Sequence, residues 1–207
     1  MTRFLLIRHG ETEWNRAQRI QGQSESELSP TGLAQAEALA AHLSQAVADA
    51  LVSSDLGRTM RTAAPLARRL GLVVEASAAL RERGFGVFEG MTPAQIALSF
   101  PAAYVSWQAR VADFVIPGGE SLVGLRQRVK AALEAIARRG HRQVIVVTHG
   151  GVLDAVYRIA GGIDDAAPRA WVMANASINR IEIDGGHWRM DAWGEVAHLS
   201  GTADDPA

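Results

Sequence analysis

The chain has 207 residues, of which 48% are hydrophobic, and its formal net charge is −1. This length and composition are typical of one globular domain with a sizeable core, and we expect residues 1–207 to form it. The near-neutral charge does not indicate a nucleic-acid or membrane partner. The sequence has no cysteine, which excludes disulfides, thiol nucleophiles and thiolate metal sites. We see no signal-peptide pattern and no apolar run that could span a bilayer, so we expect a cytoplasmic protein.

The first half of the chain alternates short apolar segments with amphipathic ones. Ser29-Pro30 is typical of a helix start, and Gly71 of a helix end. The resulting βαβαβ pattern predicts parallel strands joined by right-handed crossovers. The predicted strands are 2–7, 50–53 and 72–75, the predicted helices are 29–45 and 56–70, and 13–28 is predicted to be a polar loop.

The second half begins with an irregular, glycine-rich stretch and ends with a hairpin pattern. Between them, a helix is predicted to start at Thr92-Pro93, and residues 101–116 give a mixed signal. We expect the aromatic residues there, such as Trp107, either to pack against the sheet or to contact an apolar part of a ligand. The other predicted elements are a helix over 121–139, a strand over 143–147, a helix to residue 160, a hairpin over 178–193 and a loose tail over 199–207.

Basic side chains follow three of the predicted strands. Arg8 and His9 come directly after the first, Arg58 follows the second, and His149 follows the strand 143–147. Because neighbouring parallel strands share one carboxyl edge, where ligands bind in open α/β sheets, these groups can converge there. Two guanidiniums can hold phosphoryl oxygens and a neutral imidazole can attack phosphorus. A second imidazole, if protonated, can stabilise the charge of the transition state.

Such chemistry also needs a proton donor, and Glu82 in an irregular stretch is the candidate. Each of these residues has a plainer interpretation: Arg8 and His9 as a surface turn after a strand, Arg58 as decoration of an exposed helix, and Glu82 as a solvated carboxylate. Other site classes lack their patterns. We find no dinucleotide-binding glycine spacing, no nucleophile elbow, no zinc-binding helix and no Walker-type phosphate loop.

Several spaced motifs together resemble those of the histidine phosphatase superfamily, the phosphoglycerate-mutase-like group. The resemblance extends from about residue 4 to residue 183, with the motifs in the family's order. It implies a three-layer α/β/α fold with a mostly parallel central sheet. The matching segments are Leu6 to Asn15, Gln21-Gly22, Leu28 to Gly32, Ser53 to Leu56 with Arg58, Thr59 and Thr62, Leu80 to Glu82 with Phe85-Gly86 and Glu89-Gly90, Pro117 to Ser121, Val147 to Val152 and Asn175 to Ile178.

By this resemblance, His9 is the residue that becomes phosphorylated and Glu82 is the proton donor, which must hold its proton near neutral pH. Neighbouring arginines disfavour the imidazolium form of His9 and help to keep it a nucleophile. No metal or other cofactor is implied, since the arginines and second histidine supply the positive charge. The phosphate pocket would also contain Arg8, Arg58 and His149, and would be lined by Asn15, Gln21, Gly22 and Gly150.

The resemblance departs from the family pattern at Arg83-Gly84, where relatives often carry an acidic residue after the proton donor. Our leading hypothesis is a metal-independent phosphatase acting on a small phosphate monoester. The alternative is a cofactor-dependent phosphoglycerate mutase, which we rank second because 207 residues leave little room for a lid over the site. A non-catalytic phosphate-binding protein is third, because mere binding would not require His9 and Glu82. The sequence leaves both a monomer and a homodimer open.

Overall fold

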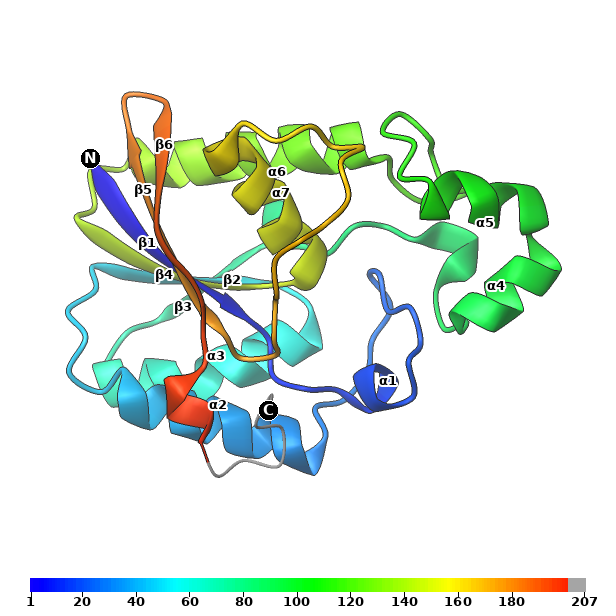
Figure 1. Ribbon diagram of the computed structural model, residues 1–207. Coiled ribbons are helices and arrows are strands. Elements are labelled where there is room, and N and C mark those ends of the chain that lie inside the picture. The colour runs from blue at the N-terminus through cyan, green and yellow to red at the C-terminus, as the bar shows by residue number, and fades with distance from the viewer. Residues whose placement is uncertain (201–207) are drawn as a thin grey trace.

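The computed structural model describes residues 1–200, which contain a six-stranded sheet in the order β3-β2-β4-β1-β5-β6 (Figure 1). Three strand pairs are parallel, β1 with β4, β2 with β4 and β2 with β3, whereas β5 and β6 are antiparallel additions at one edge. β4 therefore lies between β1 and β2 although it comes much later in the chain. The strands are β1 Thr2–Arg8, β2 Ala50–Ser54, β3 Val74–Ser77, β4 Gln143–Thr148, β5 Ile178–Asp184 and β6 His187–Glu195.

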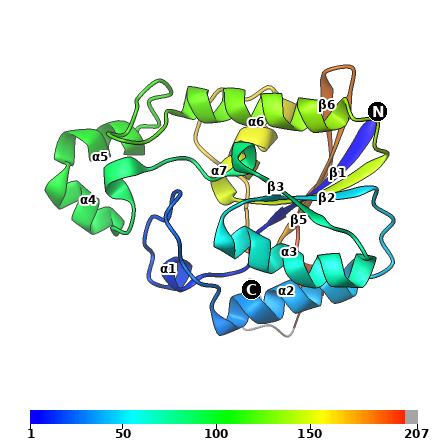
Figure 2. The ribbon, with the colours of Figure 1, turned by 180° about the vertical axis from the view of Figure 1, so that it is seen from behind.

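Helices cover both faces of the sheet and so form the predicted three layers (Figures 1 and 2). One face packs against α6 and α7, and the other against α2 and α3. β1 contributes Phe4 and Leu6 to the first core and Leu5 and Ile7 to the second, because side chains alternate along a strand. The helices are α1 Glu13–Arg16, α2 Pro30–His42, α3 Gly57–Leu70, α4 Pro93–Ser99, α5 Pro101–Gln108, α6 Leu122–Ala137 and α7 Gly150–Gly161.

α4 and α5 project away from the sheet at its carboxyl end (Figure 1). Their apolar side chains form a separate small core around Phe88, Ile96 and Ile116, against which Trp107 packs. The expectation that these aromatic residues pack against the sheet is therefore wrong. They hold this projecting unit together instead, with Trp107 and Phe88 ring centroids 5.7 Å apart.

The other differences from the predicted elements are local. The loop 13–28 contains the one-turn helix α1, because Thr12 and Asn15 form a capping box at its start. α2 begins after its predicted cap Ser29 but ends three residues before residue 45, and β3 starts two residues later than predicted. Leu199 is buried in a short 3₁₀ turn and so is not loose; residues 201–207 of the predicted tail lie outside the described residues.

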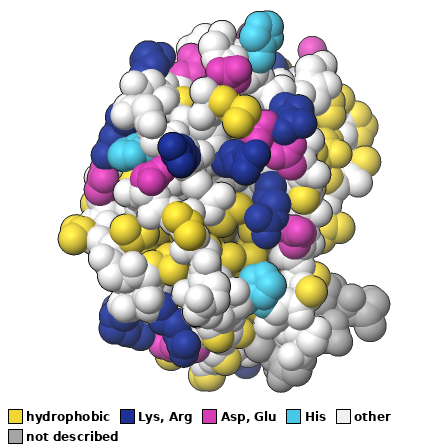
Figure 3. Space-filling view, turned by 90° about the vertical axis from the view of Figure 1, so that its left-hand side faces the viewer, with side chains coloured by type: hydrophobic (Ala, Val, Ile, Leu, Met, Phe, Trp, Pro, Cys, Tyr) yellow, Lys and Arg dark blue, Asp and Glu magenta, His cyan; other side chains and the backbone are white. Residues whose placement is uncertain are grey.

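The face at the end of the sheet away from α4 and α5 carries interspersed basic and acidic side chains (Figure 3). This distribution fits the net charge of −1. Among the helices of residues 1–200, none combines the length and the apolar character needed to cross a membrane.

Candidate active site

Two histidines meet at the carboxyl edge of the sheet. Arg8 pairs with Thr148 in the parallel register of β1 and β4, so the residues that follow, His9 and His149, lie side by side. Their ring centroids are 5.3 Å apart in an edge-to-face arrangement, and both side chains are buried. The insertion of β4 beside β1 is thus what brings the two imidazoles together.

His9 is held as a neutral imidazole with one free nitrogen. Its Nδ1 lies 2.8 Å from the carbonyl oxygen of Gly10, which can only accept a hydrogen bond, so Nδ1 carries the proton and Nε2 keeps its lone pair. Burial lowers the pKa of His9 well below its ordinary value, and the neighbouring Arg58 and Arg8 lower it further. Asn175 Nδ2 donates to the carbonyl oxygen of His9 at 3.0 Å and fixes the backbone there.

His149 is buried more deeply still. Its Nε2 lies 2.8 Å from Ser54 Oγ, whereas its Nδ1 is buried without a hydrogen-bond partner among the described residues. Burial, Arg58 and His9 together lower the pKa of His149 well below its ordinary value. The second imidazole is therefore neutral near pH 7 in this structure, and a charged form would need a bound anion beside it.

Two arginines lie next to these histidines, Arg58 buried and Arg8 half-buried. Arg58, in the first turn of α3, donates from Nη2 to the carbonyl oxygen of Gly22 at 2.6 Å and from Nη1 to that of Ser24 at 2.8 Å. Arg8 donates to the carbonyl oxygen of Met173. Burial is the main cause that lowers the pKa of Arg58, and it lowers that of Arg8 to about 10, so both remain charged near pH 7.

Three buried nitrogen atoms in this region, Arg8 Nε, Arg58 Nε and His149 Nδ1, have no hydrogen-bond partner within residues 1–200. Unsatisfied buried donors cost free energy, and native structures keep few of them without a reason. Their concentration around His9 indicates a place for an oxyanion with several acceptor oxygens, such as a phosphoryl group.

Glu82 is fixed by two backbone amides. Its Oε2 accepts from Gly151 N at 2.9 Å, at the start of α7, and its Oε1 accepts from Arg83 N at 2.7 Å. A Cβ atom on Gly151 would lie 2.2 Å from Glu82 Oε1. Gly151 therefore has to be a glycine for the carboxyl group to occupy this position.

A second carboxylate, that of Glu89, stabilises the loop whose carbonyl oxygens bind Arg58. It accepts from Gln23 N at 3.0 Å, Phe85 N at 2.9 Å and Ser24 Oγ at 2.5 Å. A Cβ atom on Gly22, whose φ is +56°, would lie 2.1 Å from Glu89 Oε1. The sequence motifs include Glu89, but we predicted no role for it. The signal that could have indicated a role is the position of this acidic residue between Gly86 and Gly90.

These groups border two cavities. The smaller, of about 160 Å³, is lined by the predicted residues Arg8, His9, Asn15, Gln21, Gly22, Arg58 and Glu82, together with Arg19, Ile20 and Phe85. His149 lies beside His9 and does not line this cavity, and Gly150 lines the larger cavity instead. Asn15 Oδ1 also accepts hydrogen bonds from Thr12 N and Asn175 Nδ2, so Asn15 has a structural role in addition to lining the cavity.

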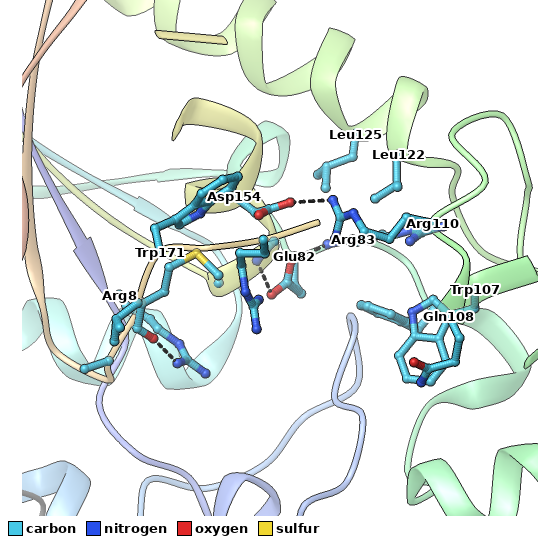
Figure 4. A pocket seen from close by; sticks show the side chains of 17 residues that line it. Arg8, Glu82, Arg83, Trp107, Gln108, Arg110, Leu122, Leu125, Asp154 and Trp171 are labelled. Carbon is cyan, nitrogen blue, oxygen red and sulfur yellow. Dashed lines mark hydrogen bonds and ion pairs between the residues drawn. The ribbon is translucent and has the colours of Figure 1, made fainter. Parts of the chain in front are cut away.

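The larger cavity has a volume of about 810 Å³, and Figure 4 shows the side chains that line it. Both cavities are lined by Arg8, Glu82 and Phe85, so these three residues stand where the cavities meet. In Figure 4, Glu82 lies centrally between Arg8 on one side and Trp107 on the other. Of the residues found only in the larger cavity, the sequence predicted Gly150 as part of the pocket and Trp107 as a ligand contact in one of two alternatives. Those with polar side chains or aromatic rings are Arg83, Trp107, Gln108, Arg110, Asp154, Arg169 and Trp171.

Within the described part of the chain, no three His, Cys, Asp or Glu side chains are grouped so that they could hold a metal ion. A family profile described as histidine phosphatase superfamily, branch 1, matches residues 4–196. The chain belongs to this superfamily. The predicted family and fold are thereby confirmed, and the chain is an enzyme of the histidine phosphatase type.

Relatives of this histidine phosphatase carry more than one activity name. A metal-independent phosphoserine phosphatase from Arabidopsis thaliana is 42% identical, covering 97% of this chain and 84% of the relative. A probable phosphoglycerate mutase GpmB from Proteus mirabilis is 36% identical, covering 99% and 98% of the two chains.

Solved structures agree with this assignment. YhfR from Bacillus stearothermophilus superimposes with a TM-score of 0.88 at 31% identity, covering 96% of this chain and all of its own. A mycobacterial glucosyl-3-phosphoglycerate phosphatase, solved in complex with VO3, has a TM-score of 0.85 at 33% identity, covering 95% of this chain and all of its own. The same mycobacterial protein was also solved with inorganic phosphate.

Proposed function

We propose that this chain is a metal-independent phosphatase that hydrolyses phosphate monoesters of small metabolites through a phosphohistidine at His9. The observation that carries the proposal is the state of His9: buried, neutral and with Nε2 free, beside two charged guanidiniums. A neutral imidazole is a competent nucleophile, and the guanidiniums reduce the repulsion between it and a phosphate dianion.

The phosphoryl group would occupy the smaller cavity. Arg8 Nε and Arg58 Nε can each donate to one of its oxygens. His149 Nδ1, which lies next to the cavity and not in its wall, can donate to an oxygen that extends past His9, when His149 Nε2 accepts from Ser54 Oγ. These fixed charges and donors would take the part that a metal ion plays in other phosphatases. Asn15, Gln21 and the backbone at Gly22 would line the same cavity, with the backbone at Gly150 on the adjoining side.

The reaction would proceed in two steps. His9 Nε2 attacks phosphorus while the bond from phosphorus to the ester oxygen breaks, and protonated Glu82 transfers its proton to that oxygen to release the alcohol. The Glu82 carboxylate then takes a proton from a water molecule, whose oxygen attacks phosphorus as the phosphorus–nitrogen bond breaks. Inorganic phosphate leaves, and both His9 and Glu82 return to their starting forms.

Two named relatives support this function. The Arabidopsis protein is called a metal-independent phosphoserine phosphatase, and the mycobacterial phosphatase binds vanadate and phosphate in its crystals. A phosphoglycerate mutase is the second candidate, since GpmB proteins match the chain over nearly their whole length. A mutase would return the phosphoryl group to a second hydroxyl and exclude water.

The test is phosphate release from p-nitrophenyl phosphate in excess chelator, with a rapid quench in alkali, where a phosphohistidine is stable, to trap the phosphoenzyme. We expect turnover, together with an acid-labile phosphoenzyme as expected of a phosphohistidine. No release from any phosphomonoester, accompanied by efficient interconversion of 2- and 3-phosphoglycerate, would favour the mutase. Dependence on an added divalent cation would refute the proposal.

A further inference from the structure

The larger cavity lies on the leaving-group side of the proposed reaction. Its volume of about 810 Å³ far exceeds the 160 Å³ cavity proposed for the phosphoryl group, and Glu82 stands between the two. A proton donor must reach the ester oxygen, so the alcohol part of the substrate has to extend past Glu82 into this larger space. The side chains of its wall therefore decide which alcohols fit.

The charges of that wall are predominantly positive. Beyond the shared Arg8 and Glu82, it contains three guanidiniums, from Arg83, Arg110 and Arg169, and a single carboxylate, that of Asp154. The carboxylate is already used: its Oδ2 accepts from Arg110 at 2.8 Å, and from Arg158 behind the wall at 3.0 Å. The cavity thus has more positive charge than its own carboxylate neutralises.

Of these three guanidiniums, Arg169 is the one that has neither a carbonyl nor a carboxylate partner among the described residues. It is exposed, lines the cavity and makes no hydrogen bond or ion pair within residues 1–200. It also lies close enough to Arg8 to lower the pKa of Arg8 by repulsion. An anion between them would relieve this repulsion.

The segment that carries Arg169 is anchored. Two residues further on, Trp171 stacks on Tyr157 with ring centroids 4.0 Å apart, and the Arg158 guanidinium lies 4.7 Å from the Trp171 ring. Trp171 Nε1 and Asp154 Oδ1 are both buried without hydrogen-bond partners among the described residues. The wall thus also holds an unused donor and an unused acceptor.

We propose that the larger cavity is a leaving-group subsite selecting phosphomonoesters whose alcohol carries a carboxylate, with Arg169 as the specificity-determining residue. The inference rests on the proposed function. A carboxylate fits the paired N–H groups of a guanidinium better than a neutral group does, and it supplies the missing anion. A hydroxyl or ammonium group next to it would give Asp154 Oδ1 a donor.

The experiment compares phosphoserine with phosphoethanolamine, which differ only by the carboxylate. For the wild type we expect kcat/KM to favour phosphoserine by about 10-fold or more, because a charge-assisted hydrogen bond contributes about 1.5–3 kcal/mol. Arg169→Gln should lower this ratio roughly 10-fold, and Arg169→Lys should restore part of it. Arg68→Gln, which removes a guanidinium paired with Glu37 on the outer surface, should keep the wild-type ratio.

Turnover of p-nitrophenyl phosphate, which has no carboxylate, reports on the proposed function separately. If the wild type hydrolyses it but shows no preference for phosphoserine, the inference fails and the proposed function stands. An equal loss on both substrates in Arg169→Gln would likewise overturn the specificity role. If the wild type hydrolyses no phosphomonoester at all, the proposed function itself fails.

Discussion

The two adjoining cavities are built in different ways. Around His9, the charged groups proposed for the chemistry are buried or half-buried and are held by backbone atoms: Arg58 by two carbonyl oxygens, Glu82 by two amides. In the larger cavity the side chains come from loops and from α5, α6 and α7, and Arg169 is exposed and unpaired among the described residues. The first construction suits a fixed chemical step, and the second suits a specificity that can change without disturbing it.

The largest expected effect separates the two cavities. His9→Ala removes the nucleophile while leaving the larger cavity unchanged, and we expect the turnover of every phosphomonoester to fall by several orders of magnitude, as in other covalent enzymes (on the order of 10⁶). The phosphoenzyme that the wild type shows in an alkali-quenched sample should disappear as well. A variant that retains turnover would show that another group attacks phosphorus.

Glu82 stands at the boundary, so its replacement should distinguish leaving groups. Glu82→Gln keeps the side-chain shape but has no acidic proton, and the rate for alkyl phosphates should fall by roughly 10²–10⁴-fold. p-Nitrophenyl phosphate, whose leaving group needs little protonation, should lose much less, and the phosphoenzyme should still form. The comparison is made by steady-state kinetics on both substrates; equal losses on the two would mean that Glu82 is not the acid.

The same contrast explains how far the sequence could be interpreted. Strand ends, the Ser29 cap and the Gly71 helix end follow from local propensity and periodicity, and they placed the four basic groups near one edge. The order of the strands in the sheet cannot be predicted from periodicity. That β4 enters between β1 and β2 depends on tertiary packing, and without it the two imidazoles would not touch.

The larger cavity was beyond sequence reasoning for a related reason. Arg83, Arg110 and Arg169 are separated by long stretches of chain, and nothing in their spacing indicates a common cavity. Arg83 was noted because it departs from the family pattern; its guanidinium is buried and donates to the carbonyl oxygen of Glu120. Side chains that meet through loops leave no periodic signal.

Replacement of Glu89 should lower the rate by a smaller factor and should affect only the phosphate cavity. Glu89→Ala would release the loop of Gly22 and Ser24 that positions Arg58, and a misplacement of about 1 Å can cost roughly 10²-fold in rate. We expect kcat/KM to fall equally for phosphoserine and phosphoethanolamine, and inhibition by vanadate to weaken. Glu89→Gln, which keeps the acceptor oxygen for Gln23 N and Phe85 N, should recover most of the activity.

The control for this prediction is Glu75→Ala, which removes a surface carboxylate paired with Arg139 and should leave the kinetics unchanged. Circular dichroism of each variant would separate a loss of folding from a loss of positioning. A selective loss on phosphoserine would instead place Glu89 with the larger cavity.

The smallest expected effect uses pH, because burial changes the pKa of the two histidines between the unfolded and the folded protein. Burial lowers the pKa of His9 and His149 in the folded protein, while in the unfolded chain both titrate near 6.5. Below that pH the unfolded state binds more protons, so the free energy of unfolding decreases as the pH falls. Between pH 7.5 and 5.5 each such histidine should cost about 1.4 kcal/mol. His9→Asn should therefore lose about that much less stability than the wild type over this interval, as measured by urea unfolding at both pH values.

The control replaces the exposed His187 by Asn and should reproduce the wild-type loss of stability. An equal loss in His9→Asn would contradict the neutral, buried imidazole on which the proposed nucleophile depends.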